Sequence, residues 1–455
     1  MSDTPGPGLV PVRRRPADPP ADLPVDEPPA EPAPAAADAV PGQAAADGTG
    51  AAWRRWRPSV VAGGTVWVSS LLAYLLVTAV AWLPTENLES KAGPVPGTLR
   101  QLISSWYRWD SEWYVNIANL GYAYDEHSTA FFPLYPMVVR AADRLLPGDT
   151  FEAALIVAAL CCLAALILAH RLVTELSGVE DARRTIIYLL AFPTGFYLTA
   201  AYNESMFVAL ALASLYCMRR GRWWWAGMFA GYAGATRMAG VMLGAAFVYE
   251  YLRQRGFSVR GLVEAGRERR LWGALRALVD RDAFAVVLVP AGLASYMLYC
   301  RLAFGDALHF LESQKFWARE GFTMPWTVVG DVVALVDSSE SVFHPDSIRN
   351  IANLTTALAV LLLLVLALVG PWRLGGDHAY LVIFAAIVVL MPMSNPIRMH
   401  YPLSSLWRFA LECTVAFMVL ARMGRSPAFD RVYLTSMLAL QGAMVVVFVQ
   451  KDFVA

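Results

Sequence analysis

The chain has 455 residues, of which 57% are hydrophobic and only 16% are charged. Soluble domains usually carry about a quarter charged residues, so the composition excludes an ordinary soluble domain and indicates an integral membrane protein. Because 37 lysines and arginines balance 37 aspartates and glutamates, the net charge gives no reason to expect a nucleic-acid partner. The five cysteines all lie in apolar runs, and they are interpreted as buried small side chains.

The first 52 residues are rich in Pro and Ala and contain no apolar run. Such a stretch cannot bury enough apolar surface to offset its ordering entropy, so residues 1–52 are predicted to be a disordered cytoplasmic tail. They also lack the apolar core of a cleaved signal peptide. Residues 53–455 are then expected to form one transmembrane domain.

The rest of the chain is dominated by apolar runs. A helix needs roughly 20 apolar residues to cross a bilayer, and about eleven segments are candidates. The predicted fold class is therefore all-α, a polytopic integral membrane protein. The runs 223–237 and 239–252 stay open to a second interpretation, as tilted or broken helices with Arg237 between them. The candidates are approximately 59–83, 152–175, 183–200, 202–218, 223–237, 239–252, 283–304, 350–370, 379–393, 405–423 and 430–449.

The distribution of lysine and arginine predicts the orientation. With a cytoplasmic N-terminus, the inner connections carry about twice as many of these residues as the outer ones, as the positive-inside rule requires. Two long loops, 85–150 and 305–349, then lie on the extracytoplasmic side, and an arginine-rich loop, 253–282, lies in the cytoplasm. Residues 131–147 are too short and too charged to span, so they are assigned to the first outer loop.

The first outer loop contains an amphipathic stretch, 98–122. Thr98 and Gln101 have capping-box spacing, and Gly121 suits a helix C-terminus. Tryptophans recur between them at helical spacing, which predicts a helix lying along the membrane interface. An alternative is a break near Trp109, with Asp110 or Ser111 capping a second helix.

Asp110 is the strongest candidate for catalysis in this loop. On a helical wheel it falls between Trp106 and Trp113, and a carboxylate beside apolar rings is costly unless something uses it. A general base is one such use. Two structural alternatives remain open: Asp110 caps a helix, or it pairs with Arg108.

Other charged residues are predicted on the same side of the membrane. Asn203 and Glu204 form a short outer turn, and Arg237 lies in an apolar run, where an ionisable residue is a functional candidate by default. A structural alternative for Arg237 is an ion pair with Glu204. Each outer cation taken singly is more typical of a residue that reaches toward lipid headgroups. These cations and their neighbours are His309, Glu312, Lys315 and Arg319 in the second outer loop, and Arg398, His400 and Arg408 near the last.

Five segments together resemble a known family in their order and spacing. They are RWDSEWYVNIANLGY (108–122), AFFPLYP (130–136), YNESMFVAL (202–210), ATRMAG (235–240) and SSLWRFAL (404–411). The sequence is similar to the PIG-V-like family of GPI mannosyltransferase 2, in the GT-C class of membrane glycosyltransferases, as a bacterial member. The resemblance covers nearly all of 59–450.

The resemblance implies an inverting transfer of mannose from a polyprenyl phosphate donor on the extracytoplasmic side, to a glycolipid or another cell-envelope acceptor. The lipid bilayer is the expected environment. The implied catalytic base is Asp110. The implied substrate-binding residues are Glu112, Tyr114, Tyr135, Asn203, Glu204, Arg237, Arg398, His400 and Arg408.

No cofactor is expected. Two carboxylates, Asp110 and Glu112, are a thin ligand set for a divalent cation, although an ion that bridges them stays open. Two other functions also stay open. A secondary transporter would use Arg237 along a transport pathway and would show inverted repeats, and a non-catalytic envelope scaffold would not need Asp110.

Overall fold

The computed structural model describes residues 41–83, 95–257, 279–319, 321–397, 400–452 and 454. Among these residues every regular element is a helix, and the one β-type pairing is an isolated antiparallel bridge between Arg319 and Ile397. The all-α prediction is therefore confirmed. The chain divides into two compact units, 1–53 and 54–455, and the second contains nearly all of the helices.

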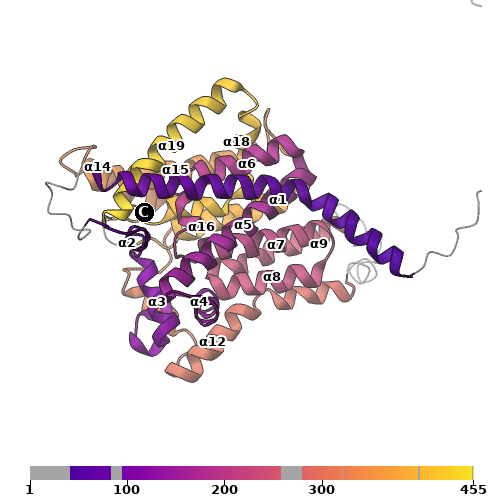
Figure 1. Cartoon of the computed structure of the whole chain (residues 1–455), viewed down its shortest axis with the longest axis horizontal. Helices are drawn as coiled ribbons and strands as arrows, with labels where there is room; N and C mark the ends of the chain where they lie inside the picture. The colour runs from indigo at the N-terminus through magenta and orange to yellow at the C-terminus, as the bar shows by residue number, and fades with distance from the viewer. Residues whose placement is uncertain are drawn as a thin grey trace, which may run out of the picture. The chain divides into compact units, whose positions relative to one another are not determined.

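Figure 1 labels most of the α-helices, and short 3-10 helices join several of them. The α-helices are α1 (Pro41–Val80), α2 (Leu99–Ser104), α3 (Asp110–Leu120), α4 (Leu134–Asp143), α5 (Thr150–Ser177), α6 (Val179–Ala191), α7 (Glu204–Arg219), α8 (Trp223–Thr236), α9 (Leu243–Gln254), α12 (Ala291–Phe304), α13 (His309–Lys315), α14 (Pro325–Asp337), α15 (Pro345–Leu368), α16 (Ala379–Met393), α17 (Leu406–Phe409), α18 (Thr414–Met423) and α19 (Pro427–Val449). The 3-10 helices are η2 (Tyr122–Tyr124), η3 (Ser128–Ala130), η4 (Gly195–Leu198), η5 (Met238–Met242), η6 (Arg281–Leu288), η7 (Gly376–His378) and η8 (Ala410–Glu412).

Five of the described helices are long and apolar enough to cross a membrane, or six if η6 and α12, which are bent by 40° relative to each other, form one span. A multi-pass protein was expected, but the expected number of spans, about eleven, exceeds this count. The other predicted spans correspond to shorter helices, such as the 16 residues of α7 and the 14 residues of α8. One physical reason is that 3-10 turns at η4 and η5 interrupt the apolar runs, and the break after α8 matches the alternative interpretation around Arg237.

The predicted N-terminal tail is only partly described. Residues 1–40 lie outside the described residues, but helix α1 begins at Pro41, inside the segment expected to be disordered. The prediction that residues 1–52 form a disordered tail stays a prediction. Most of the predicted cytoplasmic loop 253–282 also lies outside the described residues.

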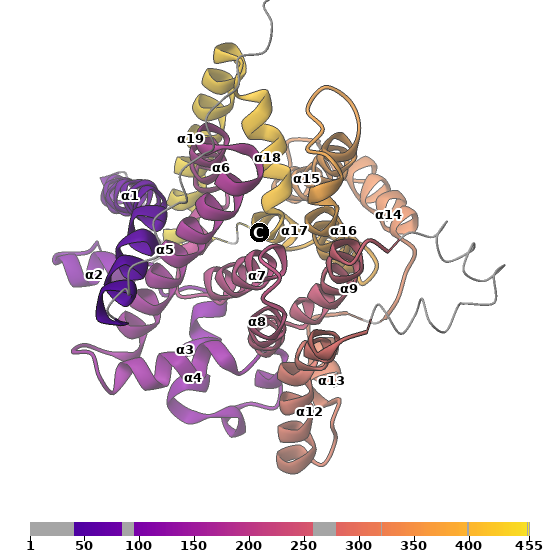
Figure 2. The ribbon, with the colours of Figure 1, turned by 90° about the vertical axis from the view of Figure 1, so that its right-hand side faces the viewer.

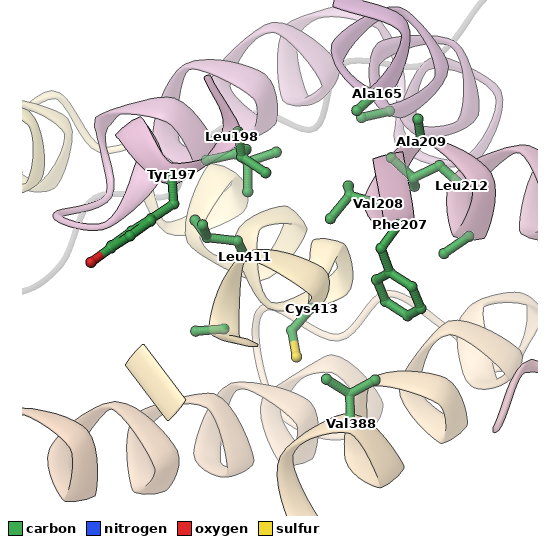
Figure 3. Close-up of a cluster of buried hydrophobic side chains, with 14 of the residues drawn as sticks. Ala165, Tyr197, Leu198, Phe207, Val208, Ala209, Leu212, Val388, Leu411 and Cys413 are labelled. Carbon is green, nitrogen blue, oxygen red and sulfur yellow. The ribbon is translucent and has the colours of Figure 1, made fainter. Parts of the chain in front are cut away.

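Helix α7 is the centre of the core. Nearly all of its residues are buried, and it packs against α5, α8 and α9, which surround it in Figure 2. Figure 3 shows Phe207 of this helix on the side that faces Cys413 and Val388 of α16. Small residues allow close approach in the neighbouring layer: a Cβ on Gly231 of α8 would lie 2.6 Å from the Leu288 carbonyl oxygen. Such close packing is the main attraction between helices in lipid.

The first outer loop folds as short helices that lie beside the core. Thr98 caps α2 by accepting a hydrogen bond from the Gln101 amide, and Gly121 ends α3 with φ = +77°, as the sequence predicted. The alternative of a break at Trp109 is confirmed, because α2 ends at Ser104 and α3 begins at Asp110. Helix α4 has ten residues, too few to span, and packs against α3 (Figures 1 and 2).

Three groups of ion pairs join helix ends at connections predicted to be cytoplasmic. In each group one carboxylate meets two or more arginines, and we call these groups the arginine clusters. They are Glu175 with Arg55, Arg171 and Arg220; Asp181 with Arg422 and Arg425; and Asp377 with Arg219 and Arg253, of which Arg253 also pairs with Glu250.

Candidate functional site

Several helix ends border a cavity of about 320 Å³. The start of α3, the start of α7 and the end of α8 contribute charged side chains, and α17 and η8 complete the charged lining. Five ionisable residues from these elements form a continuous network of ion pairs: Asp110, Glu204, Arg237, Arg408 and Glu412. Segments that are up to about 300 residues apart in sequence therefore meet at one cavity.

Asp110 is the first residue of α3. Its Oδ2 accepts a hydrogen bond of 2.8 Å from Arg408, and its side chain is 29% exposed. Neither structural alternative applies, because Trp109 rather than Asp110 is the N-cap residue, and Arg108 donates instead to the carbonyl oxygens of Tyr107 and Val449. Asp110 thus points a partly exposed carboxylate into the cavity with its orientation fixed by a buried cation.

Arg408 is held on several sides. Besides Asp110 it lies 3.6 Å from Glu204, and it donates to the Ser405 hydroxyl. Its guanidinium lies over the rings of Tyr197 and Tyr202, at 5.2 and 5.4 Å from their centroids. Cation–π contacts and shared carboxylates compensate the charge of a side chain that is only 11% exposed.

Arg237 follows the end of α8 in extended backbone, where η5 begins. Its guanidinium lies 2.7 Å from Glu412 and 3.5 Å from Glu204, and 4.4 Å from the centroid of the Phe409 ring. The predicted pairing with Glu204 is therefore present. The turn needs Gly240, because a Cβ there would lie 2.2 Å from the backbone nitrogen of Gly234.

Glu412 is a site residue that the sequence prediction missed. It ends η8, outside the five candidate spans, and only 2% of its side chain is exposed. Burial raises the pKa of Glu412 to about 7, while Arg237 opposes this rise. A signal was present in the sequence: a carboxylate in an apolar run, four residues after Arg408, has the spacing of a helical ion pair.

Two further predicted residues line the cavity. The Nδ2 of Asn203 donates to the Thr236 carbonyl oxygen at 2.9 Å, which ties the start of α7 to the end of α8 beside Arg237. Tyr114 is buried in α3 one turn after Asp110, and its ring packs edge-on against Phe131. Both residues therefore shape the cavity wall.

Four predicted residues do not join this group. Glu112 is exposed and does not line the cavity. Tyr135 is fully buried and donates to the Ala154 carbonyl oxygen, so it supports Tyr114 from behind instead of facing the cavity. His400 is exposed and also lies outside the lining, and Arg398 is outside the described residues. Glu112 points elsewhere because successive residues on a helix do not share a face.

Residues with unusual backbone conformation accompany the charged side chains. Four non-glycine residues have positive φ among those described, and three of them adjoin or line this cavity: Trp109 (+52°), Ala318 (+54°) and Ser405 (+70°). Trp109 precedes Asp110, Ala318 precedes Arg319, and Ser405 lines the cavity itself. Such conformations cost on the order of 1–3 kcal/mol each and concentrate at functional sites. In the described part of the chain no group of three His, Cys, Asp or Glu side chains is placed to hold a metal ion.

Comparison with known proteins identifies the family. Residues 73–328, more than half of the chain, match the family model described as mannosyltransferase (PIG-V). GPI alpha-1,6-mannosyltransferase 2 of Rattus norvegicus is 28% identical over 33% of this chain, and that of Mus musculus is 22% identical over 68%. These matches span 32% and 66% of the two relatives, less than two thirds of each.

Among solved structures, ArnT from Cupriavidus metallidurans bound to undecaprenyl phosphate is similar with a TM-score of 0.47 and 14% identity, over 83% of this chain and 64% of that one. The family match rests on sequence, and it contains Asp110, Glu204 and Arg237. This chain belongs to the PIG-V mannosyltransferase family.

Proposed function

We propose that this protein transfers a mannosyl residue from a polyprenyl-phosphate-linked donor to a glycolipid or another cell-envelope acceptor, with inversion at the anomeric carbon. Membership of the PIG-V family and the names of its relatives support a mannosyltransferase. The excess of arginine on the connections predicted to be cytoplasmic supports an extracytoplasmic site for the residues on the other connections. The choice of mannose rests on the family, because no cavity residue by itself distinguishes one hydroxyl configuration from another.

One observation carries the proposed mechanism: Asp110 lines a cavity that it shares with Arg237 and Arg408. Arg408 holds Oδ2 of Asp110, and Oδ1 has no hydrogen-bond partner among the described residues. In the proposed reaction, the acceptor hydroxyl gives its proton to this carboxylate while its oxygen attacks the anomeric carbon. The bond between that carbon and the phosphate oxygen breaks, and polyprenyl phosphate leaves. A single displacement of this kind inverts the configuration.

The remaining charges suit the other parts of the substrate. The leaving phosphate gains negative charge as the bond breaks, and preorganised cations in a poorly hydrated site stabilise such charge strongly. Arg237 and Arg408 supply positive charge beside Asp110. Glu204 has a buried Oε2 without a hydrogen-bond partner in the described part of the chain, so it is suited to accept a bond from a sugar hydroxyl.

The decisive experiment compares mannose transfer by the wild type and Asp110→Asn in detergent, with synthetic polyprenyl phosphate mannose and an acceptor extract. The variant keeps the shape of the side chain and removes its basicity, so transfer should fall by about 10²–10⁴-fold, the usual contribution of a general base. The matched control is Glu126→Gln in the same outer loop, whose side chain is 81% exposed and does not line the cavity. The control should transfer normally.

Other outcomes would reassign the function. A loss below about 10-fold in Asp110→Asn would indicate that Asp110 only positions the substrate. If Asp110→Asn kept normal transfer while Glu204→Gln or Glu112→Gln abolished it, the base would be that residue. If no sugar transfer occurred in any variant or in the wild type with several acceptors, transport or scaffolding would have to be tested instead.

A further inference from the structure

A segment of the second outer loop forms one wall of the cavity. Gln314 of α13 lines it, and so do Trp317 and Arg319 just after this helix. The Trp317 ring packs edge-on against Trp113 of α3 at 5.7 Å, and the Arg319 guanidinium donates to the Asn395 carbonyl oxygen at 2.7 Å. The isolated bridge to Ile397 holds the backbone of Arg319 at the same place. The segment therefore connects the first outer loop to the segment that follows α16.

Arg319 differs from the other two arginines of the cavity in its partners. Arg237 and Arg408 are each shared by two carboxylates. Arg319 forms no ion pair among the described residues, and the one acceptor there for its guanidinium is the Asn395 carbonyl oxygen. Burial, together with the neighbouring Arg237 and Arg408, lowers the pKa of Arg319 to about 10. A partly buried cation that faces two other cations, with no counter-ion among the residues that the structure describes, is costly unless an anion binds beside it.

The charges of the cavity lead to the same conclusion. Arg237 and Arg408 face three carboxylates, those of Asp110, Glu204 and Glu412. When all three are ionised, this network carries a net negative charge and would repel a phosphate. Arg319 supplies the additional positive charge, and it does so from a different wall of the cavity. Its preceding residue, Ala318, has φ = +54°, so the backbone holds Arg319 in place at a conformational cost.

We propose that Arg319 is the principal phosphate-binding residue of this cavity, and that Arg237 and Arg408 mainly hold and orient the carboxylates. The identity of the phosphate as that of a lipid-linked sugar rests on the proposed function, whereas the preference for an anion does not. Two ligands share this chemistry: the phosphodiester of the sugar donor and the phosphomonoester of the spent carrier. A guanidinium forms two parallel hydrogen bonds with either, which an ammonium cannot do.

The test measures binding without turnover. The full-length protein in detergent is titrated with polyprenyl phosphate, with synthetic polyprenyl phosphate mannose and with the uncharged polyprenol, and tryptophan fluorescence reports binding. Arg319→Ala should weaken the binding of both phosphate ligands by about 10- to 100-fold, because one charged hydrogen-bonding partner is lost. The affinity for polyprenol should not change. Arg319→Lys should recover part of the affinity. If the affinities for both phosphate ligands fall equally, the site accepts either ligand. If only one affinity falls, that ligand is the one that the site binds.

The control is Lys315→Ala in the same segment, an exposed side chain that pairs with Glu312 and does not line the cavity. It should bind all three ligands like the wild type. Unchanged polyprenol binding also shows that Arg319→Ala is folded. If polyprenol binding were lost as well, phosphate binding by Arg319→Lys would decide the question, since this variant keeps the charge. Normal phosphate affinity in Arg319→Ala would overturn the proposal. The result is independent of the mechanism, because Asp110→Asn is judged by transfer and Arg319→Ala by binding.

Discussion

Carboxylates and arginines meet in two kinds of place in this molecule, and their ratio is reversed between them. In the arginine clusters at the predicted cytoplasmic connections, one carboxylate meets two or more arginines, as Asp181 does with Arg422 and Arg425. In the cavity, Arg237 and Arg408 are each shared by two carboxylates, as Arg237 is by Glu204 and Glu412. The same two chemical groups thus form opposite arrangements.

The difference shows what each arrangement can do. A carboxylate surrounded by arginines is fully compensated, and it can join helix ends without further ligands. An arginine shared by several carboxylates compensates none of them completely, so these carboxylates keep the capacity to accept a proton or a hydrogen bond. Incompletely compensated ionisable groups in a cleft are typical of functional sites, although structural networks also contain them.

Among these predictions, Arg237→Ala should have the largest effect. A small effect would contradict the comparison between the cavity and the arginine clusters. Removal of this cation leaves Glu412 buried without its ion-pair partner and Glu204 with Arg408 alone, and breaking a buried ion pair costs about 3–5 kcal/mol. We expect a clear fall in the melting temperature in detergent together with loss of transfer. The control is Arg425→Ala, an exposed member of an arginine cluster whose Asp181 keeps Arg422. If the Arg237→Ala protein were stable and active, the buried carboxylates of the cavity would not depend on Arg237 for charge compensation.

The pH dependence of donor binding should show an intermediate effect. Because the pKa of Glu412 is raised to about 7, its carboxyl is protonated below that pH and ionised above it. Ionisation adds negative charge to the cavity, so the phosphodiester donor should bind about two- to fivefold more weakly at about pH 8 than at about pH 6, the size of a roughly 0.5–1 kcal/mol coupling between charges in a partly wet site. Titration with a diester avoids ionisation of the ligand itself.

The matched variant for this measurement is Glu412→Gln, which should bind the donor with nearly constant affinity across the same range. Arg237, Glu204 and Arg408 are the charged groups that act on Glu412. A wild-type affinity that rises with pH would contradict the assignment, because it would require the cavity to become more positive as protons leave.

Glu175→Gln should have the smallest effect, and it sharpens the comparison from the other side. Glu175 meets Arg55 and Arg171 at 2.5 and 2.6 Å, and we expect its neutralisation to cost about 1–2 kcal/mol of stability without changing transfer. Glu204→Gln is the isosteric change in the cavity, and it should reduce transfer. Thermal unfolding and transfer rates of the two variants, measured side by side, test this; equal losses of transfer in both would remove the distinction between the two regions.

Much of the fold and part of the site could be predicted from the sequence. Apolar runs gave an all-helical membrane protein, and the break at Trp109 was among the alternatives; the interfacial position of the first loop stays a prediction. Asp110, Glu204, Arg237 and Arg408 were all chosen in advance, and the structure places them at one cavity. These residues were predictable because a charged residue among apolar neighbours can be recognised in the linear sequence.

The remainder depended on contacts that no local pattern encodes. Glu112 and Tyr135 were included because they belong to the same motifs as Asp110 and Phe131, but a motif does not specify which face of a helix meets the cavity. Arg319 was visible as one of several outer cations, and only its pairing with Ile397 and Asn395 distinguishes it from Lys315. The predicted number of spans, about eleven, stays a prediction, because hydrophobicity does not show where 3-10 turns divide a buried run into shorter helices.

The three residues with positive φ around the cavity affect how this protein can be stabilised or changed by selection. Glycine would relieve the backbone at Trp109, Ala318 and Ser405, and relief of a strained position is among the easiest ways to gain stability. The same change would loosen the segments that position Asp110, Arg319 and Arg408. A screen of variants for heat resistance alone should therefore enrich glycine at these positions and yield robust but poorly active protein, so that thermal tolerance and turnover are opposed at the same three sites.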